Sequence, residues 1–249
     1  MSRPDSPWLA DHAWPDVQRW ARAGAVLAVP VGSTEQHGPH LPLSTDTDVA
    51  VAIALRLAAG WPGCPRLLLA PPLAYGSAGE HAGFAGTLSI GQQALEQLVI
   101  ELVRSASDTF AGIVLVSAHG GNSEPLTRAS RQLRAESRQV LLHQVQWVGD
   151  PHAGRPETSM LLAVSPDRVR MDQAQPGNQQ PIAQLWDELR SGGVRAVSAN
   201  GVLGDPSGAD AEEGQRLLTD LADRLIVEVQ AWLPTLPTLP ELPALVGER

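Results

Sequence analysis

Two histidines and three carboxylates are gathered in one short segment, residues 33–48, which reads STEQHGPHLPLSTDTD. Glu35 and His37 are two residues apart, so their side chains point to the same side of an extended backbone. Asp46 lies at the start of an expected helix, where the loop can fold back toward them. Imidazole and carboxylate groups are ligands for zinc, iron and manganese. The segment therefore indicates a metal site.

Further candidate ligands lie elsewhere in the chain. His119 comes directly after the apolar run GIVLVSA, while His152 and Glu157 lie in the later segment HAGRPETS. With the first segment they could hold two divalent ions about 3.5–4 Å apart, bridged by one carboxylate. Ions held in this way lower the pKa of a bound water toward ~7, which makes a hydroxide nucleophile available at neutral pH.

Each of these residues also has a structural explanation when it is taken alone. Glu35 or Asp46 could be a helix cap or a solvated acid, and His119 could be a buried structural histidine. The motif HGGN, residues 119–122, could form an anion-binding site before a helix. Four other residues are not assigned to the metal site: His40, Asp48, His12 and His143. We interpret the first two of these as structural. The number of candidates that converge favours the metal site.

Composition limits the partners and the compartment. The chain of 249 residues has a net charge of −9 and no basic run, so we expect neither nucleic acid nor membrane as a partner. The single cysteine, Cys64, excludes an internal disulfide and a thiolate metal cluster, and it fits a reducing compartment. The N-terminus lacks a signal-peptide core, and the longest apolar run, residues 25–31, is too short to cross a bilayer. We therefore expect a cytoplasmic protein.

Apolar runs and helical periodicity alternate along the chain. The apolar runs predict strands at 25–31, 66–72, 112–118 and 140–145. Periodic segments predict helices at 46–60, 95–110, from 123 onward, in a short stretch that ends at Pro166, and at 210–233. This alternation predicts an α/β fold, a three-layer α/β/α sandwich with a mostly parallel central sheet. We expect a single domain over residues 1–249, with a Pro-rich tail from about 233.

The predicted sheet explains why the candidate ligands should meet. In parallel α/β sheets, sites lie beyond the carboxyl ends of the strands. Glu35 follows the strand predicted at 25–31, and His119 follows the strand predicted at 112–118. Both therefore fall at the same edge of the sheet.

Several motifs resemble the creatininase family of metal-dependent amidohydrolases. They are GSTEQHGPHLPLSTDTD from residue 32, SAHGGN from residue 117 and HAGRPETS from residue 152. Three longer stretches resemble the mycofactocin-system branch of that family: GEHAGFAGTLSIG from residue 79, GDPHAGRPETS from residue 149 and GVLGDPSGADAEEG from residue 201. The resemblance extends from about residue 25 to residue 215. It implies a creatininase-like fold, a homo-oligomer and a dinuclear hydrolytic site containing zinc, iron or manganese.

The resemblance also implies roles for single residues. Glu35, His37, Asp46 and His119 match family metal ligands, and Asp46 matches the bridging carboxylate. Creatininase has a glutamate two positions after the histidine that matches His119, whereas this chain has Gly121. That departure disfavours creatinine as the substrate and leaves one ligand unfilled.

Four residues complete the expected site. Glu157 is the candidate replacement for the missing ligand, and His152 matches a family histidine that serves as proton donor. Glu80 and His81 are expected to line the pocket or to orient the substrate.

The branch implies a substrate that composition and spacing do not reveal. It is a radical-modified precursor peptide, from which a C-terminal Val-Tyr dipeptide is released by hydrolysis of an amide bond. Two alternatives stay open: a cyclic-amide or formamide hydrolase with the same chemistry, and a non-catalytic metal- or peptide-binding module.

Overall fold

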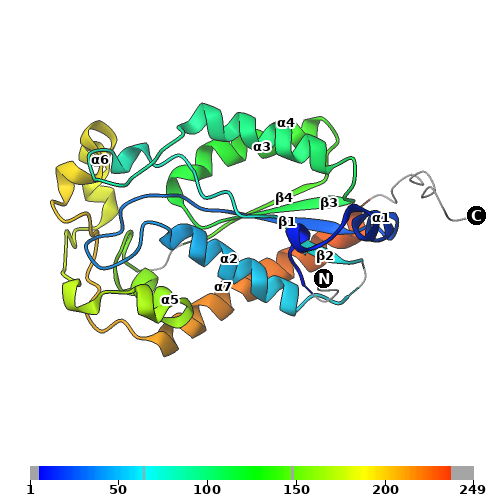
Figure 1. The fold of residues 1–249 in the computed structure, drawn as a ribbon. Helices are drawn as coiled ribbons and strands as arrows, with labels where there is room; N and C mark the ends of the chain where they lie inside the picture. The colour runs from blue at the N-terminus through cyan, green and yellow to red at the C-terminus, as the bar shows by residue number, and fades with distance from the viewer. Residues whose placement is uncertain (1–5, 64, 147–148, 237–249) are drawn as a thin grey trace, which may run out of the picture.

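The central layer of the molecule is a parallel sheet. The structure is a computed structural model that describes residues 6–63, 65–146 and 149–236, and within these residues the sheet has four strands. They are β1 (Val26–Val31), β2 (Leu67–Leu69), β3 (Gly112–Ser117) and β4 (Val140–Gln144), in the order β2-β1-β3-β4. Figure 1 shows helices on both sides of this sheet, which confirms the predicted α/β fold with three layers.

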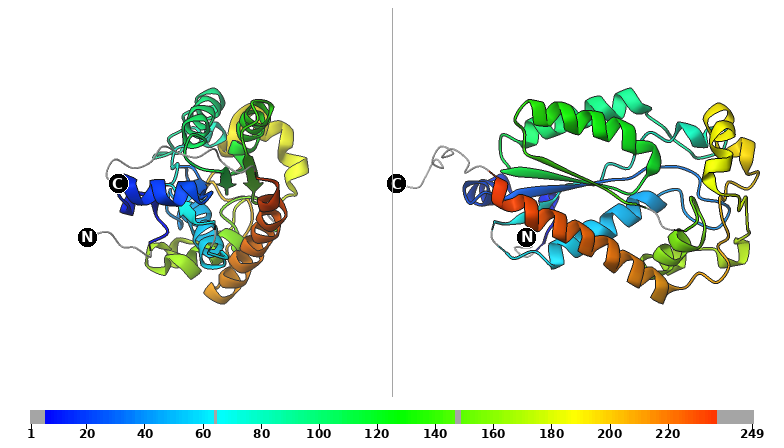
Figure 2. Two further views of the ribbon diagram at one scale, coloured as in Figure 1. Left: turned by 90° about the vertical axis from the view of Figure 1, so that its right-hand side faces the viewer. Right: turned by 180° about the vertical axis from the view of Figure 1, so that it is seen from behind.

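Strands β1 and β3 are buried on both faces, and their side chains alternate between two cores. In β1, Val26 and Ala28 belong to one core, while Leu27 and Val29 belong to the other. The first core is covered by α2 (Thr45–Ala59), α5 (Arg155–Val164) and α7 (Ala211–Trp232). The second core is covered by α1 (Trp14–Arg22), α3 (Gln92–Ala106) and α4 (Ser123–Ala135). Figure 2 shows these two helical layers from the side and from behind.

A third, smaller core lies at one end of the molecule. It forms around α6 (Ile182–Val197), where Leu185, Val194 and Leu203 are buried together. Gly193 interrupts the helix with a φ of 69°, a left-handed conformation that favours glycine. In Figure 1 this helix lies at the end of the sheet opposite α1.

Three elements differ from the expectations, and two expected features lie outside the described residues. Helices α1 and α6 were not expected from the sequence. Strand β2 has three residues rather than seven and is followed by Pro71 and Pro72, which have no N–H to donate to a neighbouring strand. The Pro-rich tail beyond residue 236 and Cys64 are not described.

The carboxyl ends of β1 and β3 lie side by side at the edge where the candidate ligands follow. Val31 at the end of β1 is in register with Ser117 at the end of β3. Helix α2 begins against the residue after β1, because a Cβ at Gly32 would collide with Thr47. The glycine therefore lets the first turn of α2, which carries Asp46, approach the loop that carries Glu35.

Within the described residues, no helix combines the length and the apolar character that crossing a membrane requires.

The packing of α5 against α7 gives a stability prediction. Gly214 in α7 faces the backbone of α5, and a Cβ there would collide with the carbonyl oxygen of Ser159 and lie 2.8 Å from the Met160 nitrogen. Helix propensity alone favours alanine over glycine by roughly 0.5–1 kcal/mol. We expect Gly214→Ala to lower the free energy of unfolding instead, by roughly 1–3 kcal/mol, because the two helices must separate.

Urea denaturation measures this change. Gly120→Ala is the control, because a Cβ at Gly120 meets no described atom within 4 Å. A Gly214→Ala variant that is as stable as wild type, or more so, would show that α5 and α7 are not held at this distance.

Candidate metal centre

The structure brings the sequence-predicted ligands together at the carboxyl edge of the sheet. Glu35 and His37 come from the loop after β1, Asp46 from the first turn of α2 and His119 from the end of β3. The last two candidates come from the segment that enters α5: His152 and Glu157. All six side chains are buried. His81 is also buried, in the 3-10 helix η2 (Gly79–His81), whereas the neighbouring Glu80 side chain is 34% exposed.

Asp46 lies at the centre of the cluster. Its Oδ1 atom is 3.2 Å from His37 Nε2, and its Oδ2 atom is 3.2 Å from His119 Nδ1. The hydroxyl of Ser33 donates a 2.7 Å hydrogen bond to Oδ2, which fixes the carboxylate plane. The two oxygens therefore face different histidines, as in a carboxylate that bridges two ions.

Backbone carbonyls fix the orientation of both histidines. His37 Nδ1 lies 3.3 Å from the Glu35 carbonyl oxygen, and His119 Nε2 lies 3.0 Å from the Ser77 carbonyl oxygen. Those nitrogens donate N–H to the carbonyls, so the opposite nitrogens, His37 Nε2 and His119 Nδ1, face Asp46 and would offer their lone pairs to an ion once deprotonated. Metal-binding histidines are commonly held in this way.

Several buried atoms of the cluster have no hydrogen-bond partner among the described residues. They are both carboxylate oxygens of Glu35 and the Nε2 atom of His37. Buried polar atoms without partners are costly, at roughly 1–3 kcal/mol each. Three groups of donor atoms are close enough to hold an ion: Glu35, Asp46 and His119; His37, Asp46 and Glu157; and Glu35, His37 and His152. Divalent cations would satisfy the unpaired atoms, so the donor set fits a metal centre.

Burial and mutual attraction shift the pKa values of the ligands in the metal-free chain. Burial raises the pKa of Glu35 to about 8 and that of Glu157 to about 7. Burial alone would lower the pKa of His37 and His119, but neighbouring carboxylates, chiefly Asp46 and Glu35 respectively, raise both to about 10. Against its own burial, the attraction of the two histidines lowers the pKa of Asp46 well below its usual value.

His81 and His152 have the opposite electrostatic character. Burial, followed by the charge on His37, lowers the pKa of His81 to about 3 and that of His152 well below its usual value. Both imidazoles are therefore neutral at pH 7. Their rings lie 4.4 Å apart between centroids, and the His152 ring lies 4.3 Å from that of His37.

Gln36 connects these two neutral histidines and was not expected from the sequence. Its amide nitrogen lies 2.9 Å from His81 Nδ1 and 3.0 Å from the Gly201 carbonyl oxygen, which accounts for both amide protons. His152 Nε2 then donates to the Gln36 backbone carbonyl oxygen at 2.9 Å, which leaves His152 Nδ1 free, 3.9 Å from Glu35 Oε1. The only sequence signal was the position of Gln36 between Glu35 and His37.

The structure gives a physical reason for glycine at position 121. A Cβ at Gly121 would collide with the Ser77 carbonyl oxygen and with Glu80 Oε1, and it would lie 2.6 Å from His119 Nε2. A larger side chain therefore cannot enter from this position without displacing Glu80. Glu157 enters the cluster from α5 instead, with Oε2 3.9 Å from His37 Nε2.

The alternative interpretation of Asp46 as a helix cap was wrong. Helix α2 begins at Thr45, so Asp46 lies within its first turn and directs its carboxylate into the cluster. Asn122 precedes α4 without capping it through its side chain. Its amide instead accepts from the Ser77 nitrogen and donates to the Gly32 carbonyl, which connects the loops around the centre.

The histidines and the acid that were not assigned to the metal lie outside the donor groups. Buried His40 contacts the Thr158 hydroxyl, and Asp48 forms an ion pair with Arg168. His143 lies 2.9 Å from the Glu228 carboxylate. His12 Nε2 contacts the Ser6 carbonyl oxygen, far along the chain from the ligands.

A cavity of about 560 Å³ adjoins the centre. Gln36 forms part of its wall and also contacts His81 and His152. The rest of the wall combines apolar side chains with two cations and small polar groups: Gly38, Pro39, Leu41, Pro42, Leu43, Phe84, Ala85, Arg168, Arg170, Ala199 and Asn200. Gln36 therefore connects the centre to a space large enough for part of a peptide.

Comparison with known sequences gives a consistent result. The family model described as "Creatininase: Creatinine amidohydrolase" matches residues 10–229. The chain is 49% identical over 219 residues to the mycofactocin precursor peptide peptidase of Mycobacterium ulcerans (84% of this chain, 86% of the relative). It is 48% identical over 217 residues to the peptidase of that name from Mycolicibacterium smegmatis, with the same two coverages. It is also 30% identical to the creatinine amidohydrolase of Pseudomonas putida (67% of this chain, 75% of the relative).

Solved structures show the same fold. A mutant creatininase superimposes with a TM-score of 0.76 and 25% identity, covering 92% of this chain and 100% of its own. A structure named "Creatininase Mn" has a TM-score of 0.74 at 24% identity, with the same coverages. A mutant creatininase of "Zn-Zn type" has a TM-score of 0.75 at 23% identity, covering 92% of this chain and 99% of its own.

The pKa values of the metal-free cluster predict that metal binding releases protons. With pKa values of about 10, His37 and His119 are imidazolium at pH 7, and a metal binds only neutral imidazole. Raising the pH toward 10 therefore favours binding, by about tenfold in affinity per pH unit for each proton released. Lowering the pH weakens metal binding further, because the Glu35 carboxylate takes up a proton below about pH 8 and the Glu157 carboxylate below about pH 7.

Calorimetric titration of the metal-free protein with Zn²⁺ measures this release. Two buffers with different ionisation enthalpies at the same pH should give different apparent heats, corresponding to at least one proton released. Equal heats in the two buffers, with an affinity that does not change from pH 6 to pH 8, would contradict the charge states assigned to the cluster.

Proposed function

Since the chain belongs to the creatininase family, we propose that it is a metal-dependent peptidase of mycofactocin biosynthesis. It hydrolyses an amide bond of the modified precursor peptide and releases the C-terminal Val-Tyr dipeptide. The observation that carries this proposal is the identity of 48–49% over 84% of the chain to peptidases of that name. The buried donor set at the carboxyl edge of the sheet supplies the chemistry such an activity needs.

The residues present fit two divalent ions of zinc, iron or manganese. Glu35 and His119 would hold one ion, and His37 and Glu157 would hold the other. Asp46 would contribute to both sites. When bound, the ions supply Lewis acidity that polarises the scissile carbonyl and makes water nucleophilic at neutral pH.

His152 would handle the proton in this reaction. Its Nε2 atom is occupied by the Gln36 carbonyl, and its neutral Nδ1 atom is free to accept the proton of the attacking water. The same atom can then protonate the leaving amine, which would otherwise be a poor leaving group. The Gln36 backbone carbonyl holds the ring in this tautomer, and His81, which accepts from the Gln36 side-chain amide, directs its N–H toward Glu35 at 3.3 Å. These contacts support a positioning role for His81.

Other properties belong to the same proposal. We infer that the chain works as one domain in the cytoplasm, as a homo-oligomer, with the precursor peptide as its partner. A cyclic-amide hydrolase is the second candidate, favoured by the 30% identity to a creatinine amidohydrolase. Glycine at position 121 speaks against creatinine as its substrate, because creatininase has a glutamate there. A non-catalytic binding module is disfavoured by the complete donor set and the adjoining cavity.

Mass spectrometry of the modified precursor peptide tests the activity. Metal-loaded protein should release the Val-Tyr dipeptide, whereas protein treated with a chelator should leave the peptide intact. Creatinine and a formamide are the control substrates and should react at least about a hundredfold more slowly, a difference of roughly 2.7 kcal/mol in the barrier. An intact peptide after incubation with fully loaded protein would refute the proposal.

Substitution of the central carboxylate tests the ligand assignment. We expect Asp46→Asn to lose metal and activity together, because the neutral amide cannot bridge two cations. Asp48→Asn is the matched control: Asp48 is in the same helical turn but pairs with Arg168 instead. Elemental analysis should find full metal content in the control and at most half in Asp46→Asn. Full metal content and full activity in Asp46→Asn would show that the centre lies elsewhere.

A further inference from the structure

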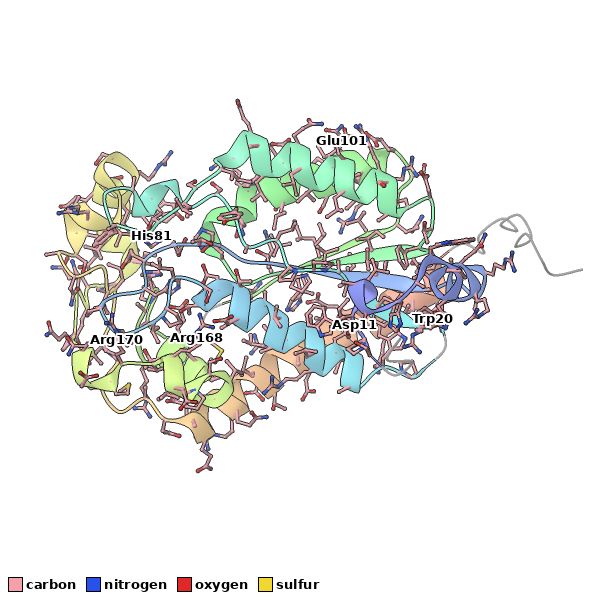
Figure 3. All side chains as sticks on the ribbon, in the orientation of Figure 1. Asp11, Trp20, His81, Glu101, Arg168 and Arg170 are labelled. Atoms are coloured by element: carbon pink, nitrogen blue, oxygen red, sulfur yellow. The ribbon has the colours of Figure 1, made fainter. Side chains whose placement is uncertain are left out.

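The cavity beside the metal centre contains two arginines in an otherwise acidic protein. The chain carries 27 acidic and 18 basic residues, yet the described wall of this cavity includes Arg168 and Arg170 and no carboxylate. Figure 3 places both side chains at the same end of the molecule as His81, away from Asp11 and Trp20. A ligand in this cavity therefore meets positive charge.

The two arginines differ in how their charge is compensated. Arg168 Nη1 lies 2.7 Å from the Asp48 carboxylate, and its Nη2 atom donates to the Ser44 hydroxyl. Arg170 donates only to a neutral acceptor, the Pro39 carbonyl oxygen, at 2.6 Å, and forms no ion pair with any described residue. Arg170 is thus the uncompensated cation of the cavity.

Arg170 is also held in place. Its backbone nitrogen donates a 2.9 Å hydrogen bond to the His40 carbonyl oxygen, and its guanidinium is anchored on Pro39. One N–H group of a guanidinium is used in that anchor, which leaves four for a ligand. A planar guanidinium held in this way can bind a carboxylate through two parallel hydrogen bonds.

We propose that Arg170 binds the C-terminal carboxylate of the peptide substrate, and so selects the bond two residues from the chain end. This inference rests on the proposed peptidase activity and adds the recognition site for the released dipeptide. The cavity provides a carboxylate site at Arg170 and apolar walls at Leu41, Leu43 and Phe84 for the side chains of the dipeptide.

The length of the chain between Gln36 and Pro39 agrees with this assignment. Gln36 contacts His152 at the reaction centre, and Pro39, three residues later, holds the Arg170 guanidinium. Three residues span at most roughly 11 Å, and the two residues of a dipeptide span about 7 Å. A scissile carbonyl near His152 would therefore place the terminal carboxylate within reach of Arg170.

The test compares two forms of the modified precursor peptide, one with a free C-terminal carboxylate and one with a C-terminal carboxamide. For wild type, we expect amidation to lower kcat/KM by at least about tenfold, because a charge-assisted bidentate contact is lost. For Arg170→Gln, kcat/KM on the free acid should fall to the value for the amide, with less than about a twofold difference between the two forms. Arg170→Lys should retain part of the preference, because it keeps the charge.

Arg168→Gln is the matched control in the same cavity. Its charge is already paired with Asp48, so this variant should keep the wild-type preference for the free acid. Metal content and thermal midpoint are measured for each variant, so that loss of the centre or of the fold is separated from loss of recognition.

The outcomes separate this inference from the proposed function. Equal cleavage of acid and amide by wild type, or a preserved preference in Arg170→Gln, would overturn the role of Arg170 while leaving the peptidase activity intact. If wild type cleaves neither form, the peptidase proposal fails, and binding of the free dipeptide then decides the inference. Val-Tyr should bind wild type at least about tenfold more tightly than Val-Tyr amide, and Arg170→Gln should bind both equally. Equal binding by wild type would overturn the carboxylate site.

Discussion

Burial of ionisable groups around Asp46 is the constraint on which this structure depends. Charges removed from water are costly unless they are paired or bind a cation. The chain meets part of this cost with the Ser33 hydroxyl and with backbone carbonyls that fix His37 and His119. Within the described residues it leaves both Glu35 oxygens without a hydrogen bond, although His81 and His119 lie 3.3 and 3.1 Å from them. The arrangement therefore stores in the metal-free protein the free energy that cation binding recovers, and it makes the fold and the metal site mutually dependent.

The sequence predicted the architecture and most of the centre because these depend on local signals. Continuous apolar runs such as 112–117 become strands buried on both faces, and the residue that follows such a strand must lie at the carboxyl edge of the sheet. His119 and Glu35 could be placed in this way without coordinates. His152 lies in the loop before α5 and Glu157 in the first turn of that helix, so no preceding strand marks their position, and the match of family motifs supplied their individual roles.

Other features depend on contacts between distant segments and could not be predicted. Gln36 was inconspicuous because its importance lies in contacts with His81 and with His152, 116 residues away. Glycine at position 121 looked like a missing ligand, whereas in the structure it leaves the space that Glu80 occupies. Helix α6 was missed because its core is small and because Gly193 breaks its periodicity.

The origin of the cavity wall has a consequence for how such enzymes diverge. All the candidate ligands precede residue 158, whereas part of the wall, including Arg170 and Asn200, comes from the connection between α5 and α7. The part of that connection around α6 packs on its own small core, whereas Val202 belongs to the first core and the Gly201 carbonyl holds the Gln36 amide. Evolution can therefore reshape the part around α6 and acquire a new substrate, while the residues that contact Gln36 and the sheet are kept.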